Sequence, residues 1–273
     1  RCDIKGVDDG AILAGHRGQF RVARAIVKAK IPGALHYFVS TFYYPPVRKK
    51  RTTLVPPILR PEVLKAKATA ERGEHVVVYQ TGPSHEALID ALRRLRDVDF
   101  LIYGMKAIAV DSSDGSGEGS NLHFRPFSQQ GFIDDLASCR AVVAGGGFSL
   151  MSECVYLGKP MLSVPLKGQF EQTLNALWLE RLGYGLYRNA ADAIGITELL
   201  SRDTEFAANL AGHQQDGNVE LLAQLDALLN TVETGGGRSW VGNGDSESDG
   251  DGDGDGDGDG ASDSDSDSDS DGA

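Results

Sequence analysis

The chain has 273 residues, of which 41% are hydrophobic, so it can bury a full core in one large or two small domains. Its formal net charge of −12 suggests an acidic protein, but 13 of the 39 acidic residues follow residue 244, where no Lys or Arg stands. The preceding body carries 27 basic and 26 acidic side chains, with +9 on residues 1–60 and −8 on residues 61–244. The charge therefore lies in blocks of alternating sign.

The sequence also indicates the cellular compartment in which we expect the protein. No apolar run approaches the roughly 18 residues that a membrane-spanning helix needs, and no signal-peptide pattern is present. Cys2, Cys139 and Cys154 are odd in number and lack CxxC spacing, which favours buried thiols in a reducing compartment over a disulfide framework or a zinc site. We expect a cytoplasmic protein, either soluble or peripheral on the inner face of the cell membrane. Because the chain begins with Arg1, we expect a fragment, with a processed chain as the alternative.

Residues 18–30 predict a helix whose basic side chains are spaced four, three and four residues apart, which places them on one face. Such a stripe is most often a solvated helix face. Because Phe20, Val27 and Ile31 lie beside it, an alternative is contact with anionic lipid headgroups. The stripe consists of Arg17, Arg21, Arg24 and Lys28.

A strand is predicted at residues 35–42 (LHYFVSTF), and the segments 48–51 (RKKR) and 55–61 (VPPILRP) indicate a crossing linker. From residue 235 a glycine-rich stretch leads into Asp-Gly and Ser-Asp repeats that begin at residue 249, and this tail cannot bury enough apolar surface to offset its ordering entropy. We expect this tail to be disordered and solvating. An alternative is that it lies against the basic N-terminal segment and competes with anionic surfaces.

Between these ends, apolar runs alternate with segments of helical spacing. This alternation indicates an α/β fold with a Rossmann-like, doubly wound parallel sheet, whose ligands bind at the carboxyl ends of the strands. The loops 81–84, 145–147 and 166–172 fall at that edge. Strands are predicted at residues 75–80, 100–103, 121–125, 141–144, 161–164 and 185–187. Helices are predicted at residues 85–96, 132–138, 148–157 and 171–182.

Three successive glycines, Gly145, Gly146 and Gly147, follow the predicted strand at residues 141–144 and precede a helix. They allow positive φ and leave no Cβ, so backbone amides can approach an anion closely at the start of the helix. Tight packing of strand against helix is the alternative, although one glycine would serve it. The turn therefore indicates a phosphate site.

Four segments resemble, in order, the nucleotide-sugar domain of GT-B glycosyltransferases. They are FIDDL at 132–136, AGGGFSLMSE at 144–153, GKPMLSVP at 158–165 and QFEQTLNA at 169–176. The likeness is greatest to the family of the peptidoglycan N-acetylglucosaminyltransferase, which adds GlcNAc to a lipid diphosphate, and to related uncharacterised archaeal and bacterial glycosyltransferases. It runs from about residue 54 to about residue 230. VPPILRPEVL stands where that family has an asparagine-proline-x-arginine segment.

The resemblance implies roles at the nucleotide end of a UDP-sugar. Arg60 matches an arginine that reaches the diphosphate, which suits a guanidinium. Ser84 resembles a serine that faces the phosphates, although TGPS replaces the usual glycine pair. The backbone of Ile133 stands where the uracil edge is read. Glu153 would hold the ribose hydroxyls, with a solvated carboxylate near a helix start as the alternative.

The same resemblance implies that the segment after the glycine turn lines the nucleotide. Ser149 would lie near the phosphates, between Phe148 and Leu150. Gln172, with Asn175 and Gln169 nearby, is placed to bind the sugar hydroxyls, and a polar residue that merely opens a helix is the alternative. The resemblance implies no metal and no cofactor, because GT-B enzymes usually stabilise the departing diphosphate with helix dipoles and basic side chains.

Three parts of the chain are expected. Residues 1–57 would be a remnant of an N-terminal, acceptor-side domain with its linker, residues 58–232 the nucleotide-sugar domain, and residues 233–273 the tail. The family's catalytic base is a histidine in a glycine-rich turn of the N-terminal domain. His16 in AGHRGQ superficially resembles that turn, but a surface or linker histidine is the favoured interpretation. The catalytic residues are therefore unassigned.

These features predict a hexosyltransferase that moves a sugar from UDP to an acceptor by metal-independent inverting displacement. The resemblance implies a lipid-linked acceptor and membrane contact, and we expect no nucleic-acid partner. One alternative is a non-catalytic donor-binding half that needs a partner chain, and another is a UDP-sugar 2-epimerase. A nicotinamide dehydrogenase fits least, because the glycine turn follows the fourth predicted strand and lacks GxGxxG spacing.

Overall fold

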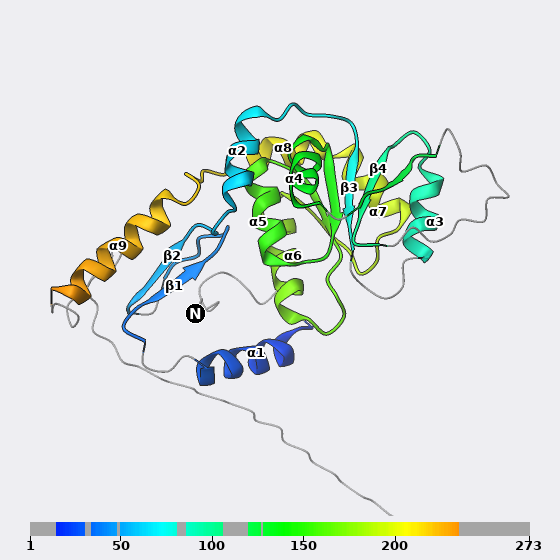
Figure 1. The fold of residues 1–273 in the computed structure, drawn as a ribbon. Coiled ribbons are helices and arrows are strands. Elements are labelled where there is room, and N and C mark those ends of the chain that lie inside the picture. The colour runs from blue at the N-terminus through cyan, green and yellow to red at the C-terminus, as the bar shows by residue number, and fades with distance from the viewer. Residues whose placement is uncertain are drawn as a thin grey trace, which may run out of the picture.

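A computed structural model of the chain describes residues 15–30, 34–47, 50–80, 86–105, 120–126 and 128–234. Within these ranges the centre is a parallel sheet of six strands (Figure 1). All the strands predicted from residue 75 onward are present, which confirms the α/β fold. They are β3 (Val76–Tyr79), β4 (Phe100–Tyr103), β5 (Leu122–Phe124), β6 (Ala141–Ala144), β7 (Met161–Ser163) and β8 (Gly185–Tyr187).

The strand order is β5-β4-β3-β6-β7-β8, so the chain winds outward from β3 to one edge and then outward from β6 to the other. At the centre, Val77 of β3 is in register with Leu101 of β4 on one side and with Val142 of β6 on the other. Reversal of the winding direction between β3 and β6 is the doubly wound arrangement predicted from the sequence.

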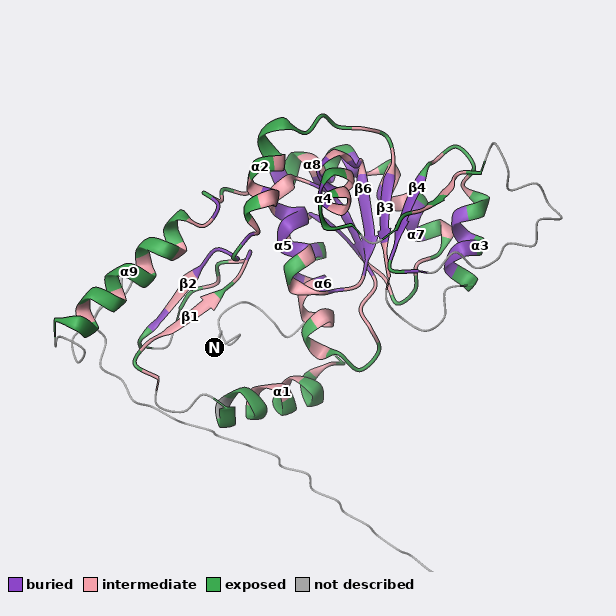
Figure 2. Cartoon of the chain, viewed as in Figure 1, coloured by how far each residue is buried: buried purple, intermediate pink, exposed green. Residues whose placement is uncertain are grey.

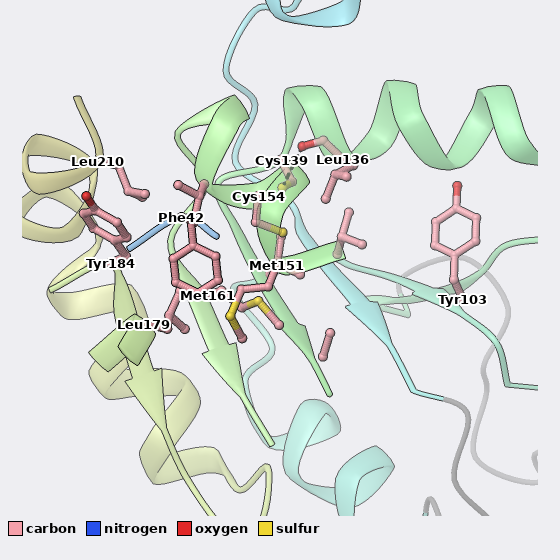
Figure 3. Close-up of a cluster of buried hydrophobic side chains, with 14 of the residues drawn as sticks. Phe42, Tyr103, Leu136, Cys139, Met151, Cys154, Met161, Leu179, Tyr184 and Leu210 are labelled. Carbon is pink, nitrogen blue, oxygen red and sulfur yellow. Dashed lines mark hydrogen bonds between the residues drawn. The ribbon is translucent and has the colours of Figure 1, made fainter. Parts of the chain in front are cut away.

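Helices cover both faces of the sheet because successive strand residues point to opposite sides. Val76 and Val78 pack in one core cluster with α3 (Glu86–Arg94), α7 (Ala193–Ser201) and α8 (Asp203–Ala211). Val77 faces a second cluster beneath α4 (Gln129–Ser138), α5 (Phe148–Leu157) and α6 (Phe170–Arg181), part of which is drawn in Figure 3. The four inner strands β4, β3, β6 and β7 are almost wholly buried (Figure 2), as parallel strands covered on both faces require, whereas the edge strand β5 is not.

The segment before the sheet contributes to its core. It contains α1 (Arg17–Lys30) and the parallel pair β1 (Tyr37–Ser40) and β2 (Thr52–Val55). Just after β1, Phe42 is only 4% exposed and its ring stacks on Phe148 at 5.9 Å between centroids. Tyr43 stacks on Trp178 of α6 at 3.8 Å. Two aromatic side chains therefore fasten this segment to the α5 and α6 face.

The linker predicted at residues 55–61 is shorter than expected. Its first residue ends β2 and its last begins α2 (Pro61–Thr69), a helix that was not predicted. Pro61 occupies the first helical turn, where its missing amide costs nothing, and Arg60 before it is extended with φ −64° and ψ 140°. The prolines were interpreted as linker signals, whereas Pro61 starts a helix.

The C-terminal segment returns to this linker. Asn218 precedes α9 (Val219–Glu233), and its side chain accepts a hydrogen bond from the Leu59 amide and donates one to the Leu59 carbonyl, both at 2.9 Å. No residue of α9 is buried. The helices α7, α8 and α9 extend beyond the last predicted element. None of the described helices is long and apolar enough to cross a membrane.

Candidate functional site

The site is built at the carboxyl edge of the two central strands. Because the winding reverses between β3 and β6, the loops that follow these strands diverge to opposite faces, and this is the position at which open α/β sheets bind their ligands. The glycine turn at residues 145–147 follows β6 directly. The turn after β3, with Ser84, lies outside the described residues.

The N-terminus of α5 presents free backbone donors to this edge. Gly147 is the N-cap, in an extended conformation with φ −62° and ψ 128°, and no side chain caps the helix. The first intrahelical bond joins the Met151 amide to the Gly147 carbonyl at 3.1 Å, so the helix itself provides no partner for the amides of Phe148, Ser149 and Leu150. Three amides at the positive end of a helix favour an anion.

Two amide side chains of α6 hold the glycine turn in place. The Gly146 amide donates to Gln172 Oε1 at 3.2 Å, and the Gly146 carbonyl accepts from Asn175 Nδ2 at 3.0 Å. Gln172 Oε1 also accepts from the Leu166 amide at 3.1 Å, which ties the loop after β7 to the same point. Gln172 and Asn175 therefore orient the turn, whatever else they bind.

The glycines of the turn differ in the space that surrounds them, so glycine is required at some of these positions for a different reason than at others. A Cβ added to Gly146 would lie 2.3 Å from the Gln172 carbonyl oxygen, so this position is glycine because two backbones meet there. A Cβ added to Gly147 would meet nothing within 4 Å. Packing alone accounts for Gly146, whereas the space above Gly147 is open to a ligand.

Arg60 and Glu153 lie 93 residues apart and form a two-point ion pair. Arg60 Nε donates to Glu153 Oε1 at 2.6 Å, and Arg60 Nη2 donates to Oε2 at 2.7 Å. The Glu153 side chain is only 6% exposed, whereas that of Arg60 is 38% exposed. The hydrogen bond to Glu153 raises the pKa of Arg60 further above its usual range. The structure thus brings together the two residues to which the sequence assigned the diphosphate and the ribose.

An aromatic and acidic cluster at the ends of β3 and β4 was missed by the sequence reasoning. The Phe132 ring lies 5.6 Å from the ring of Tyr79 and 5.0 Å from that of Tyr103. The Tyr103 hydroxyl donates to Asp135 Oδ2 at 2.5 Å, and Arg125 Nε lies 3.1 Å from the same oxygen. Burial and this hydrogen bond raise the pKa of Tyr103. The signal was present, since each of these strands ends in tyrosine.

Two further positions are Ile133, an expected site residue, and His16, for which a surface or linker role is the favoured interpretation. Ile133 is wholly buried and is the fifth residue of α4, where a helical amide bonds to the carbonyl four residues earlier. The helical amide thus has a partner within α4, and contact of this backbone with the uracil stays a prediction. His16 precedes α1, and its Nδ1 lies 3.4 Å from Gln19 Oε1. Among the described contacts, none joins His16 to the glycine turn.

A comparison with protein-family models decides the family. Residues 5–202 match the model described as "Glycosyl transferase family 1". The chain belongs to this family. No match was found among curated proteins.

Solved structures support the same fold. The glycosyltransferase of kitacinnamycin shares 18% identity over 79% of this chain, with a TM-score of 0.53. The spinosyn forosaminyltransferase SpnP shares 17% identity over 82% of this chain, with a TM-score of 0.50. The calicheamicin glycosyltransferase CalG4 shares 17% identity over 85% of this chain, with a TM-score of 0.55. These likenesses confirm the GT-B fold. The chain spans 63%, 68% and 62% of the three structures' own lengths.

The second and third glycines of the turn should respond differently to the same substitution. Gly146→Ala should lower the free energy of unfolding by about 2 kcal/mol or more, because the new methyl group overlaps the Gln172 carbonyl. Gly147→Ala should change it by less than about 0.5 kcal/mol, because its φ is compatible with alanine and the space is open. Urea unfolding followed by circular dichroism measures both. Equal losses in the two variants would contradict the packing argument.

Proposed function

We propose that the chain is a hexosyltransferase that binds the diphosphate of a UDP-sugar at the N-terminus of α5 and transfers the sugar to an acceptor. The observation that carries the proposal is the uncapped start of α5, a helix whose second turn carries Glu153 in its pair with Arg60. Free amides and an exposed guanidinium favour a diphosphate, and a carboxylate can accept hydrogen bonds from both hydroxyls of a ribose. Membership of glycosyl transferase family 1 supports the same reaction class.

The proposed reaction is metal-independent inverting displacement. The acceptor hydroxyl attacks the anomeric carbon, the bond from that carbon to the diphosphate oxygen breaks, and a general base takes the hydroxyl proton. The amides at residues 148–150 and Arg60 stabilise the negative charge that develops on the departing diphosphate. The residue that acts as base is unassigned.

The sugar end of the proposed site lies toward α6. Gln172 and Asn175 are the candidates for binding sugar hydroxyls, but their amide groups already bond to Gly146. Gln172 Nε2 donates to Gln169 Oε1 at 2.5 Å. Any hydroxyl that binds here must therefore share or replace these bonds, which makes sugar recognition sensitive to the position of the turn.

A lipid-linked acceptor of the peptidoglycan-precursor type and contact with an anionic membrane surface are part of the proposal. They are supported by α1, which is attached to α6 by Phe20 and Phe170, with ring centroids 6.1 Å apart. Val27 of this helix is 43% exposed and lies three residues after Arg24, which places the two side chains on the same face. Exposed apolar groups beside cations are typical of helices that lie on anionic lipid.

UDP binding tests the donor site. Isothermal titration calorimetry with UDP should show binding to the wild-type chain and about tenfold weaker binding to Glu153→Ala, because hydrogen bonds to the carboxylate are lost. Glu205→Ala is the matched control, since it removes a carboxylate paired with an arginine, Arg202, on α8. Equal affinity in wild type and Glu153→Ala would contradict the assignment. UDP binding without transfer would instead favour a donor-binding half that needs a partner chain.

Vesicle flotation tests the membrane contact. At low salt the chain should bind vesicles that contain phosphatidylglycerol and should not bind vesicles made only of phosphatidylcholine. Arg21→Glu with Arg24→Glu should weaken this binding at least tenfold, because each lost cation contributes about 1 kcal/mol near an anionic surface. Arg93→Glu with Arg94→Glu on α3 is the control for net charge. Equal binding by both double variants would contradict a specific role for α1.

A further inference from the structure

We infer that Arg60 couples the ribose and diphosphate subsites, because one edge of its guanidinium orients Glu153 while the other edge is free for phosphate. This inference rests on the proposed function. It makes Arg60 a positioning residue for ribose recognition as well as a phosphate ligand.

The hydrogen-bond count supports two simultaneous tasks. A guanidinium carries five N–H donors, and the pair with Glu153 uses one on Nε and one on Nη2. Three donors remain, two of them on Nη1, at the edge that faces away from the carboxylate. Because the arginine side chain is 38% exposed and the glutamate only 6%, the arginine is the more accessible member of the pair. A phosphate can therefore reach Arg60 without breaking the bonds to Glu153.

The backbone on each side of the pair is fixed. Leu59, directly before Arg60, is 1% exposed, and Asn218 binds both its amide and its carbonyl. The Arg60 carbonyl accepts from the Val63 amide at 3.0 Å as α2 begins. Glu153 lies in the second turn of α5, a helix whose buried residues include both of its neighbours. The guanidinium and the carboxylate are thus presented to each other by rigid elements, which reduces the entropy lost on binding.

Charge makes the coupling necessary. A carboxylate as buried as that of Glu153 is costly to keep ionised without a partner. A diphosphate bound nearby would add like charge, and Arg60 compensates for both anions at once. Loss of the two-point contact should therefore disturb the ribose contact even when a positive charge remains. Lysine provides that test, because it keeps the charge but has no planar fork.

The readout is the preference for UDP over 2′-deoxy-UDP, measured by calorimetry, because this ratio isolates the ribose hydroxyl. Wild type should prefer UDP by about tenfold. In Arg60→Lys the preference should fall to about twofold or less. Glu153→Gln should lose it to the same extent, and the double variant should lose no more, because the two residues act as one unit.

Arg72→Lys is the control, since Arg72 and Arg140 each bind the similarly buried carboxylate of Asp203 at 2.6 Å, outside the site. It should keep the wild-type ratio. A wild-type ratio in Arg60→Lys, with both ligands weakened equally, would overturn the coupling and leave Arg60 as a phosphate ligand only. If thermal melts show Arg60→Lys to be unfolded, a wild-type ratio in Glu153→Gln overturns it equally. Failure of the wild-type chain to bind UDP would overturn the proposed function itself.

Discussion

The contact between the glycine turn and the start of α6 is the constraint on which the rest of the site depends. At Gly146 two backbones meet so closely that no Cβ fits. The Gln172 side chain also accepts a hydrogen bond from the Gly146 amide. The turn therefore cannot shift without moving α6. Because α5 begins at the next residues, this contact also fixes the direction in which the free amides of the helix point.

Around that point, distant parts of the chain support the same small region. Arg60 reaches Glu153 from the start of α2, and Asn218 holds the preceding residue from the C-terminal segment. Phe42, before β2, stacks on Phe148 at the first position of α5. The helix that carries the free amides is thus contacted directly by Phe42 and Arg60, and Asn218 fixes the backbone next to Arg60. Such contacts keep the donors oriented before a ligand arrives, which is what electrostatic stabilisation requires.

Local sequence patterns were sufficient to predict the strands of the sheet, but they did not predict the tertiary contacts between side chains. Apolar runs such as VVVY at residues 76–79 predicted the strands, because parallel strands are buried on both faces. The helix α2 was missed because the prolines before it suit a linker as well as a helix start. Site positions came from the resemblance, whereas the pairing of Arg60 with Glu153 and of Tyr103 with Asp135 depends on tertiary placement. The division of the chain at residues 57 and 58 stays a prediction.

A crystal structure of the chain with UDP tests the central claim most directly. We expect the diphosphate within hydrogen-bonding distance of the amides at residues 148–150 and of Arg60 Nη1. Arg60 Nε and Nη2 should remain on Glu153, whose carboxylate should accept a ribose hydroxyl. UDP bound away from the start of α5, or bound there without contact to Glu153, would contradict the account.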